Sequence, residues 1–471
     1  MENKMRRETT PLIKPLSSFH TQNSIYTKLI FMFFSVGITI FLYTFHSNYY
    51  YFYSSSSLQI KKPLPSNSQE INISTTSNDD VSKSKTSYEF DVLEEVSDLL
   101  ELHDEAIAES PTPSTSKKSP KGQVKPKCDL FKGEWVPNPK GPAYNNNTCW
   151  LIEAPQNCMT NGRPDSGYLY WRWKPRDCEL PKFDPKRFLN SMRNKGFAFI
   201  GDSISRNHLR SLLCILSQVE QPKQINQVEQ TRSSTWIFPS YNLTLAGIWA
   251  PFLLKADLFD NKNGVSTSDI ALHLDKLDEN WTIQYTNFDY VMIAGGQWFL
   301  RTAIYLENDK IQGCHYCAGK NLTELGFDFA YRKALNQVFG FISGSSHKPQ
   351  VLFRTNTPSH FEYGKWNSGG FCNRVAPFKE GQMGLIEPDR IMYEIEMQEF
   401  EKVSKTGISL RLFDTTLLAL LRPDGHPGPY RSYYPFAKGE NVAVQNDCLH
   451  WCMPGPIDSW NELVSEMLFR G

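Results

Sequence analysis

The sequence predicts an α/β fold in which helices cover both faces of a mainly parallel sheet. Four nearly continuous apolar runs are typical of strands that are buried on both faces. They span 196–201, 288–296, 350–355 and 407–414. Helical patterns alternate with them and span 203–217, 327–343, 388–405 and 456–470. Such alternation indicates an α/β fold, whose functional groups lie at the carboxyl ends of the strands. The residues at those ends are Ser203, Gly295, Gly296, Arg354 and Asp414.

The N-terminal part indicates a protein anchored in a membrane by one helix. Residues 29–45 are apolar and uncharged, a length near the lower limit for crossing a bilayer. Five lysines and arginines precede this run, whereas residues 46–60 carry no charge. The positive-inside rule therefore predicts a cytosolic tail at 1–28, a signal anchor at 29–45 and a luminal remainder. A cleaved signal peptide is the alternative, but no small-residue cleavage site follows the apolar run.

Cysteines and glycosylation sequons support a luminal location for the rest of the chain. All ten cysteines lie between Cys128 and Cys452, and an oxidising lumen makes disulfides the default. Five Asn-x-Ser/Thr sequons follow the anchor. They begin at Asn72, Asn146, Asn242, Asn280 and Asn321. Together these features indicate the secretory pathway.

Composition divides the luminal part into three segments. Residues 46–125, rich in Ser, Thr, Lys and Pro, predict a flexible stem, because they bury too little apolar surface to fold alone. Residues 126–180 are dense in Cys, Trp, Pro and Gly, which indicates a loop-rich segment held by disulfides. Residues 181–471 carry the strand–helix alternation. With 50 basic and 50 acidic residues the chain has no net charge, so nucleic-acid binding has no electrostatic support.

The stretch FAFIGDSISRNHLRSLLC (197–214) contains a candidate nucleophile. Gly201 ends a predicted strand and permits a sharp turn, and Ser203 begins the next helix. Free N–H groups and the helix dipole favour an oxyanion at that point. The alternative is that Asp202 or Ser203 only caps the helix. The tripeptide alone does not decide between the two.

A serine nucleophile needs a base, and the base needs an orienting group. In NDCLHWCMPGPIDSW (446–460), Asp447 and His450 stand three residues apart, before the last predicted helix. In a turn both side chains can point the same way, so that His450 accepts the proton of Ser203 while Asp447 holds the imidazole. The alternatives are a buried histidine and a capping aspartate. The two motifs together are far more specific than either alone.

These motifs resemble the plant trichome-birefringence-like family of cell-wall polysaccharide O-acetyltransferases. The resemblance covers residues 128 to about 470 and is strongest to the xyloglucan O-acetyltransferase branch. Beside Gly-Asp-Ser and DCLHWCMPGP, the matching stretches are CDLFKGEWVPNP, QNCMTNGRPDSGYLYWRWKPRDC, GCHYCAGKNLTEL, LLRPDGHPG and HWCMPGPID. The resemblance implies a three-layer α/β/α domain at 181–471, similar to the GDSL/SGNH esterases, with the disulfide-rich segment packed on it.

The resemblance also implies the roles of the catalytic residues. Ser203 is the nucleophile that becomes acetylated, His450 the general base and Asp447 its orienting partner. The expected reaction is a double displacement, in which a sugar hydroxyl takes the acetyl group from an acetyl-serine. Backbone N–H groups at Ser203 and near Gly296 are the candidates for the oxyanion hole. Further candidates for oxyanion or substrate contacts are Gly201, Asp202, Arg206, Asn207 and Trp298; for Arg206 and Asn207, solvent-facing polar positions are the alternative.

Two positions depart from the family pattern. Many members carry Gly-His-Trp where this chain has Gly296-Gln297-Trp298. In FRTNTPSHFEYGKW, Thr357 stands in place of a serine. In the same block His360 is expected either to line an acceptor groove or to brace the core and loops.

The pair Cys314 and Cys317, in the order Cys-His-Tyr-Cys, suggests zinc or redox chemistry at first sight. A structural zinc site needs a second ligand pair, which the sequence lacks, and the lumen favours a local disulfide. We therefore expect no metal. For the other cysteines the resemblance implies the pairs Cys128–Cys178, Cys149–Cys214, Cys158–Cys452 and Cys372–Cys448.

Three functions are consistent with these residues. The first is a type II Golgi membrane enzyme that acetylates xyloglucan on side-chain galactose, with mannan or xylan as alternative acceptors. The second is an acetylesterase with the same three residues, because hydrolysis differs only in the attack of water. The third is a glycan-binding protein without catalysis. We expect no bound cofactor. The acetyl donor would be acetyl-CoA or an acetylated carrier, supplied through a membrane partner.

Overall fold

A seven-stranded sheet lies at the centre of the fold in the computed structural model, which describes residues 128–228, 232–260, 266–437, 439 and 444–470. The strand order is β13-β12-β9-β3-β6-β5-β4. The parallel strands are β3 (Gly196–Gly201), β6 (Leu243–Trp249), β9 (Tyr290–Ile293), β12 (Gln350–Arg354) and β13 (Leu410–Phe413). Strands β5 (Ser233–Phe238) and β4 (Lys223–Val228) extend the sheet in antiparallel orientation. The four predicted strands are confirmed.

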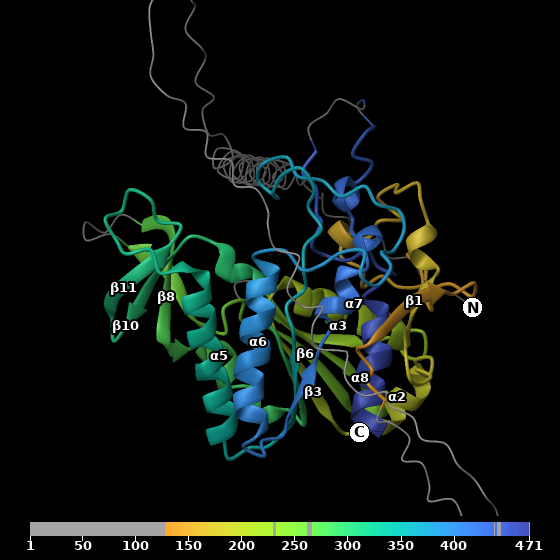
Figure 1. The fold of residues 1–471 in the computed structure, drawn as a ribbon. Helices are drawn as coiled ribbons and strands as arrows, with labels where there is room; N and C mark the ends of the chain where they lie inside the picture. Colours follow the sequence, from red (N-terminus) through yellow and green to blue (C-terminus); the bar gives the residue numbers. More distant parts are fainter. Residues whose placement is uncertain (1–127, 229–231, 261–265, 438, 440–443, 471) are drawn as a thin grey trace, which may run out of the picture. The chain divides into compact units, whose positions relative to one another are not determined.

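Helices cover both faces of this sheet, as Figure 1 shows. Phe197 and Phe199 of β3 belong to a core cluster with α2 (Pro185–Ser191), α3 (Ser203–Leu216) and α8 (Asp458–Arg470). Ala198 and Ile200 point to the opposite face and pack with α5 (Gly326–Gly344) and α6 (Asp389–Ser404). Because alternate residues of a strand face opposite sides of the sheet, β3 contributes side chains to the hydrophobic cores on both faces. The predicted three-layer α/β/α arrangement is therefore confirmed.

A second, four-stranded sheet was not predicted from the sequence. Its order is β11-β10-β8-β7, and it lies beyond α5 in Figure 1. Its strands are β7 (Leu254–Asp260), β8 (Ser266–Leu277), β10 (Ala303–Glu307) and β11 (Lys310–His315). Only β8 and β10 pair in parallel. These strands mix polar with apolar residues, and such half-buried segments give a weaker signal than the continuous apolar runs of the main sheet.

The Cys-rich N-terminal segment packs on the main domain. Its strands β1 (Gly133–Pro137) and β2 (Trp171–Pro175) pair in antiparallel orientation, in a segment expected to be mostly loops. Trp135 and Trp173 are buried with their rings 5.7 Å apart, and both belong to the same cluster as α3 and α8. The indole of Trp135 donates to the carbonyl oxygen of Leu418 at 2.9 Å. The segment thus shares a core with the domain that follows it.

Five disulfides connect the ten cysteines. They are Cys128–Cys178, Cys149–Cys214, Cys158–Cys452, Cys314–Cys317 and Cys372–Cys448. This is the pairing that the resemblance implies, with a local bridge between Cys314 and Cys317. The Cys158–Cys452 bridge spans 294 residues and joins the N-terminal segment to the loop that carries His450.

Some sequence predictions fall outside the described residues, namely the cytosolic tail, the anchor at 29–45, the stem to 125 and the sequon at Asn72. Within the part that is described, no helix has the length and apolar character to cross a bilayer. The asparagines of two sequons, Asn242 and Asn321, are exposed. Asn146 and Asn280 are half-buried, and their amide nitrogens donate to Thr160 Oγ1 and to the Trp249 carbonyl oxygen.

Candidate active site

The turn between β3 and α3 places Ser203 at the start of a helix with its hydroxyl uncommitted. Gly201 has a φ of +149°, and a Cβ there would lie 2.3 Å from the carbonyl oxygen of Ala294, so only glycine fits. Asp202 caps the helix, because its carboxylate accepts from the N–H groups of Ile204 and Ser205 at 3.0 and 3.4 Å. The cap is therefore Asp202. Among the described residues neither the hydroxyl nor the N–H of Ser203 has a hydrogen-bond partner.

The carboxylate of Asp202 lies near a buried cation, the guanidinium of Arg354. Asp202 is 3% exposed, and its carboxylate lies 3.9 Å from the guanidinium of Arg354, which is 1% exposed. Asp414, at the end of the neighbouring strand, instead accepts from the Tyr393 hydroxyl at 2.7 Å. Arg354, the last residue of β12, and Asp414, directly after β13, thus bond to protein groups of the domain.

Asp447 and His450 form a hydrogen-bonded pair within one turn. One carboxylate oxygen of Asp447 accepts from the N–H groups of Leu449 and His450 at 3.2 and 3.0 Å. The other lies 2.8 Å from the imidazole Nδ1 of His450. A carboxylate accepts only, so Nδ1 carries the proton and Nε2 keeps its lone pair. The three-residue spacing therefore leaves His450 with one free basic nitrogen.

The electrostatics of the pair strengthen that base. Burial lowers the pKa of His450, but the negative charge of Asp447 more than offsets this, so the pKa lies above its usual value. Burial would raise the pKa of Asp447, yet the charge and hydrogen bonds of His450 hold it far below its usual range. The charges of Asp202 and Arg206 also act on His450, which brings the start of α3 and this turn into one electrostatic site.

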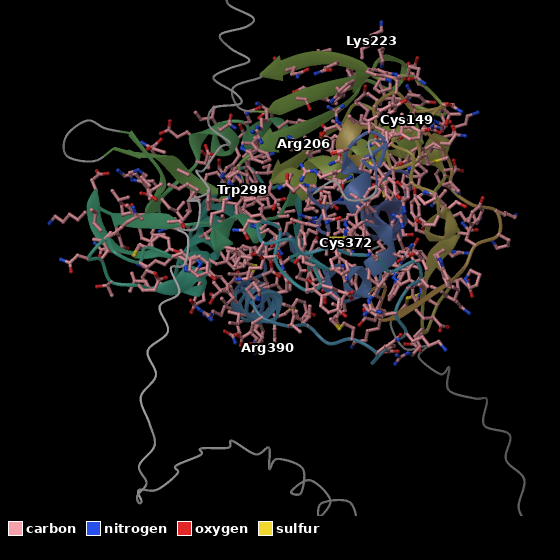
Figure 2. The ribbon with its side chains drawn as sticks, turned by 90° about the horizontal axis from the view of Figure 1, so that it is seen from above. Cys149, Arg206, Lys223, Trp298, Cys372 and Arg390 are labelled. Atoms are coloured by element: carbon pink, nitrogen blue, oxygen red, sulfur yellow. A yellow bond between two sulfur atoms is a disulfide. The ribbon has the colours of Figure 1, made fainter. Side chains whose placement is uncertain are left out.

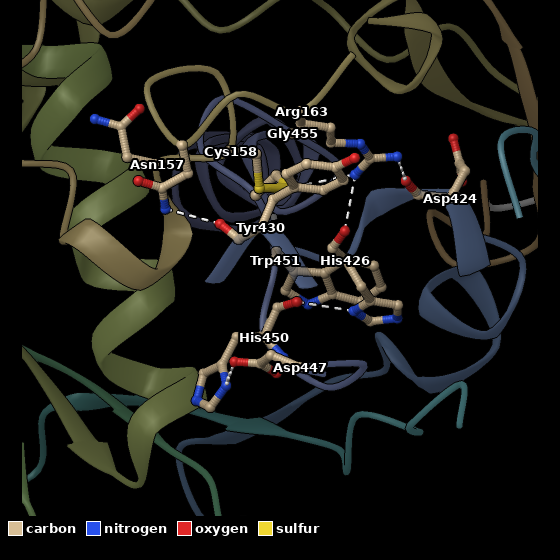
Figure 3. Close-up of a disulfide and its surroundings, with 12 residues drawn as sticks. Asn157, Cys158, Arg163, Asp424, His426, Tyr430, Asp447, His450, Trp451 and Gly455 are labelled. Atoms are coloured by element: carbon tan, nitrogen blue, oxygen red, sulfur yellow. Dashed lines mark hydrogen bonds and ion pairs between the residues drawn. A yellow bond between two sulfur atoms is a disulfide. The ribbon is translucent and has the colours of Figure 1, made fainter. Parts of the chain in front are cut away.

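Asn207 ties the His450 loop directly to α3. Its amide oxygen accepts from the Trp451 N–H at 2.8 Å, and its amide nitrogen donates to the Trp451 carbonyl at 3.4 Å. Asn207 is 4% exposed, so its amide holds the loop in place and does not face a substrate. The disulfides at Cys448 and Cys452 fix the loop on either side. Figure 3 draws the second of these bridges in one view with Asp447 and His450.

Gly296 lies three residues beyond the end of β9. Its φ is +137°, and a Cβ would lie 2.6 Å from the amide oxygen of Asn356. Gln297, where many relatives have histidine, donates to Asp389 at 2.8 Å and to the Thr357 carbonyl at 3.0 Å. Burial raises the pKa of Asp389 to about 6. Gln297 therefore links the start of a 3-10 helix to α6. Its amide cannot act as an acid or a base in the way that an imidazole at this position could.

A cavity of about 500 Å³ opens beside this edge of the sheet. Its aromatic lining includes Trp249, Phe252 and Trp298, with the two tryptophan rings 5.4 Å apart. Polar groups of Lys255, Asp257, Asp278 and Glu279 complete the wall. Trp249 pairs with Gly201 in the register of β3 and β6, so the cavity begins next to the Ser203 turn.

The remaining candidates are held by protein partners. Arg206 contacts the carboxylate of Glu153 at 3.3 Å and lies over the Trp249 ring. In the view from above, Arg206 lies between the labelled Trp298 and Cys149 (Figure 2). His360 is 7% exposed and bonded to His426 and to the Leu420 carbonyl, so it braces the loops and does not line a groove.

Sequence reasoning missed several residues of the site, and the reasons differ. Trp249 is the last residue of β6, a strand that was not predicted from the sequence. The sequence suggested that Asn207 donates to a substrate. Its actual partner, Trp451, lies 244 residues away in the sequence, so no local pattern could indicate this contact. His426 stands in the quoted LLRPDGHPG, but nothing local predicts its contact with His450. Within the described structure no hydrogen bond joins Ser203 to His450; each keeps a free polar atom, and Asn207 connects their elements.

The fold and these groups define a class: an α/β/α domain with a serine on a strand–helix turn and an Asp–His pair at the same edge. Comparison with known proteins gives the family. Residues 180–467 match the GDSL/SGNH-like acyl-esterase family found in Pmr5 and Cas1p, and residues 126–179 match the PMR5 N-terminal domain. The chain belongs to the trichome birefringence-like proteins of this esterase-like family.

Three relatives illustrate the similarity. Trichome birefringence-like protein 26 of Arabidopsis thaliana is 56% identical over 367 residues, 77% of this chain and 82% of the relative. Xyloglucan O-acetyltransferase 1 of Populus trichocarpa is 41% identical over 372 residues, 77% of this chain and 86% of the relative. The Arabidopsis protein of the same name is 45% identical over 349 residues, 74% of this chain and 82% of the relative.

The Asp447–His450 pair predicts a specific pH response. Asp447→Asn removes the charge that raises the pKa of His450 and leaves the burial that lowers it. We expect the acid limb of the activity profile to move to lower pH, because a base with a lower pKa stays neutral further into acid. The plateau rate should fall roughly 10²- to 10⁴-fold, since the imidazole loses its orientation.

The measurement is kcat/KM against pH for both proteins. Glu401→Gln is the matched control, because it neutralises an exposed carboxylate paired with Lys405 on α6. An acid limb that stays in place in Asp447→Asn, or that moves equally in Glu401→Gln, would contradict the assignment.

Proposed function

We propose that this protein is a polysaccharide O-acetyltransferase that transfers acetyl groups to xyloglucan through an acetylated Ser203. The observation that carries the proposal is the Asp447–His450 pair, whose free Nε2 belongs to a loop bonded to the helix that Ser203 begins. Acetyl transfer is favoured over hydrolysis by the relatives named xyloglucan O-acetyltransferase. Side-chain galactose is the acceptor unit in this proposal.

In the first half-reaction, the Ser203 oxygen attacks the carbonyl carbon of an acetyl donor. His450 Nε2 takes the hydroxyl proton as the new C–O bond forms, and Asp447 stabilises the resulting imidazolium. The oxyanion is expected at the N–H of Ser203, which Asp202 leaves free by capping only the next two positions. Collapse of the intermediate breaks the bond to the leaving group, which receives the proton from His450. The product is an acetyl ester of Ser203.

In the second half-reaction, a sugar hydroxyl takes the place of the donor's leaving group. His450 removes its proton, the sugar oxygen attacks the acetyl-serine, and a second tetrahedral intermediate forms. Its collapse releases the Ser203 oxygen, which recovers the proton from His450. Water in place of the sugar would give acetate, so the outcome depends on what occupies the acceptor position.

The tryptophan-lined cavity supports a sugar as that acceptor. Aromatic rings offer flat apolar faces, and the carboxylates and the lysine at its wall are hydrogen-bond partners for hydroxyl groups. In this proposal Trp249 and Trp298 hold the glycan beside Ser203. The acetyl donor would be acetyl-CoA or an acetylated carrier fed by a membrane partner. The enzyme would work in the Golgi lumen as a type II membrane protein.

The direct test of function is Ser203→Ala. The full chain, made in an oxidising secretory host, is mixed with acetyl-CoA or an artificial acetyl donor and separately with xyloglucan, mannan and xylan oligosaccharides. Mass spectrometry follows the addition of acetyl groups. We expect acetylated xyloglucan from the wild type and a loss of roughly 10⁴-fold or more in the variant. Transfer that persists in Ser203→Ala would exclude this serine.

The other outcomes of that experiment separate the alternatives. Free acetate alone, formed only by the wild type, would show an acetylesterase. Acetylation confined to mannan or xylan would change the acceptor but leave the chemistry. Glycan binding without any acetyl chemistry would leave a binding protein.

A second prediction concerns the cavity. Trp298→Ala removes an aromatic face from its lining, so we expect KM for the oligosaccharide acceptor to rise about tenfold with little change in kcat. The control is Trp150→Ala, an exposed tryptophan outside the cavity that bonds to Gln221. Equal acceptor kinetics in both variants would show that the glycan does not use this cavity.

A further inference from the structure

Two buried histidines form a chain of contacts behind the Asp447–His450 turn. Nε2 of His360 lies 2.8 Å from the carbonyl oxygen of Leu420, and Nδ1 of His426 lies 2.8 Å from the carbonyl oxygen of His450. The two inner nitrogens, Nδ1 of His360 and Nε2 of His426, are 2.7 Å apart. Figure 3 shows His426 reaching the backbone of His450. His360 and His426 are only 7% and 4% exposed.

The row of contacts from Leu420 through His360 and His426 to His450 needs a definite number of protons on the four imidazole nitrogens. Carbonyl oxygens only accept, so both outer nitrogens must carry hydrogen. A neutral imidazole has one N–H, and with both hydrogens outside, the two inner nitrogens would face each other with lone pairs at 2.7 Å. Moving one hydrogen inward would leave a buried carbonyl against a lone pair, which costs the desolvation of both groups. Only a third proton, shared between the rings, satisfies all three contacts.

The surroundings contain charges of both signs. Burial lowers the pKa of both imidazoles taken singly, to about 4 for His360. The charged groups that act on the two rings are Glu362, Asp424 and Asp447, which favour a cation, and Arg163 and Arg374, which oppose it. In addition, the Trp451 ring stacks on His426 with centroids 4.3 Å apart, and an aromatic face attracts a cation. Shared protons in such pairs titrate with an affinity that belongs to the pair.

We propose that His360 and His426 share one additional proton and act as a positioning element for His450. The protonated pair forms an unbroken hydrogen-bonded chain from Leu420 to the backbone carbonyl of the residue that carries the base. Loss of the proton breaks one link of that chain and frees the loop from this support. The inference rests on the proposed function only for its effect on rate; the shared proton is a property of the fold.

The position of this pair predicts a second limb in the pH profile. The acid limb comes from protonation of His450, as argued above. A rise in pH removes the shared proton, so the loop loses a support and kcat falls on the alkaline side while KM for donor and acceptor stays unchanged.

Two variants remove the shared proton but keep the outer hydrogen bonds. In His360→Gln the amide nitrogen takes the place of Nε2 and still donates to Leu420. In His426→Asn the amide nitrogen takes the place of Nδ1 and still donates to His450. We expect both to fold, to lose the alkaline limb and to lower kcat about tenfold. His426→Ala, which also removes the donor to His450, should lower kcat further.

The control is His347→Gln, in which the amide nitrogen takes the place of Nε2 and still donates to the Phe288 carbonyl outside the site, and it should retain the wild-type profile. If His360→Gln and His426→Asn keep the wild-type alkaline limb, or if the wild type has none, the positioning role is wrong. If hydrolysis replaces transfer, the same profiles are read from the release of acetate.

An observation independent of activity tests the proton itself. In ¹⁵N-histidine NMR spectra of the full chain, the shared proton should give one far-downfield resonance coupled to both rings, absent from both variants. Its loss on raising pH should follow a single titration of the pair. Two neutral rings, each with one N–H throughout the pH range of activity, would overturn the proposal even if acetyl transfer is confirmed. Conversely, the resonance would stand if the proposed function failed.

Discussion

The two oxygens of the Asp447 carboxylate make different hydrogen bonds, and the geometry of the candidate site depends on both sets. One closes the turn by accepting backbone N–H groups, and the other holds the imidazole of His450. Because a single rigid carboxylate makes both sets of contacts, the path of the chain fixes the direction of the base. This constraint explains the spacing Asp-x-x-His and sets the tautomer that leaves Nε2 free. The charge that orients the ring also raises its pKa, so geometry and basicity have the same cause.

The Asp447–His450 turn can act on Ser203 only if it keeps a fixed position relative to α3. The rest of the fold holds it in that position. Asn207 bonds to Trp451 from the helix side, and the disulfide of Cys452 reaches back to Cys158 in the N-terminal segment. The N-terminal segment therefore does more than cover the core, since it holds the loop of the candidate base. This accounts for a compact unit in which residues far apart in sequence share one cluster of buried side chains. The site is held by long-range covalent and hydrogen bonds around a short local motif.

The sequence was informative wherever the physical signal is local. Nearly continuous apolar runs predicted β3, β9, β12 and β13, because strands buried on both faces carry few polar positions. Gly201, Ser203, Asp447 and His450 were found because sharp turns, helix starts and short spacings restrict residue types. The second sheet was missed because its strands are half-polar, and the roles of Asn207 and His426 were missed because they depend on contacts 244 and 24 residues apart in sequence. Contacts of that kind follow from packing, which no window of sequence contains.

The central claim is that Ser203 carries the acetyl group and His450 activates it. The most direct test mixes the full chain with an acetyl donor and no acceptor, quenches in acid and maps the peptides by mass spectrometry. The account predicts one acetyl ester, on Ser203, that disappears when a glycan acceptor is added before the quench and does not form in His450→Ala. An acetyl group on another residue, or undiminished acetylation of Ser203 in His450→Ala, would contradict it.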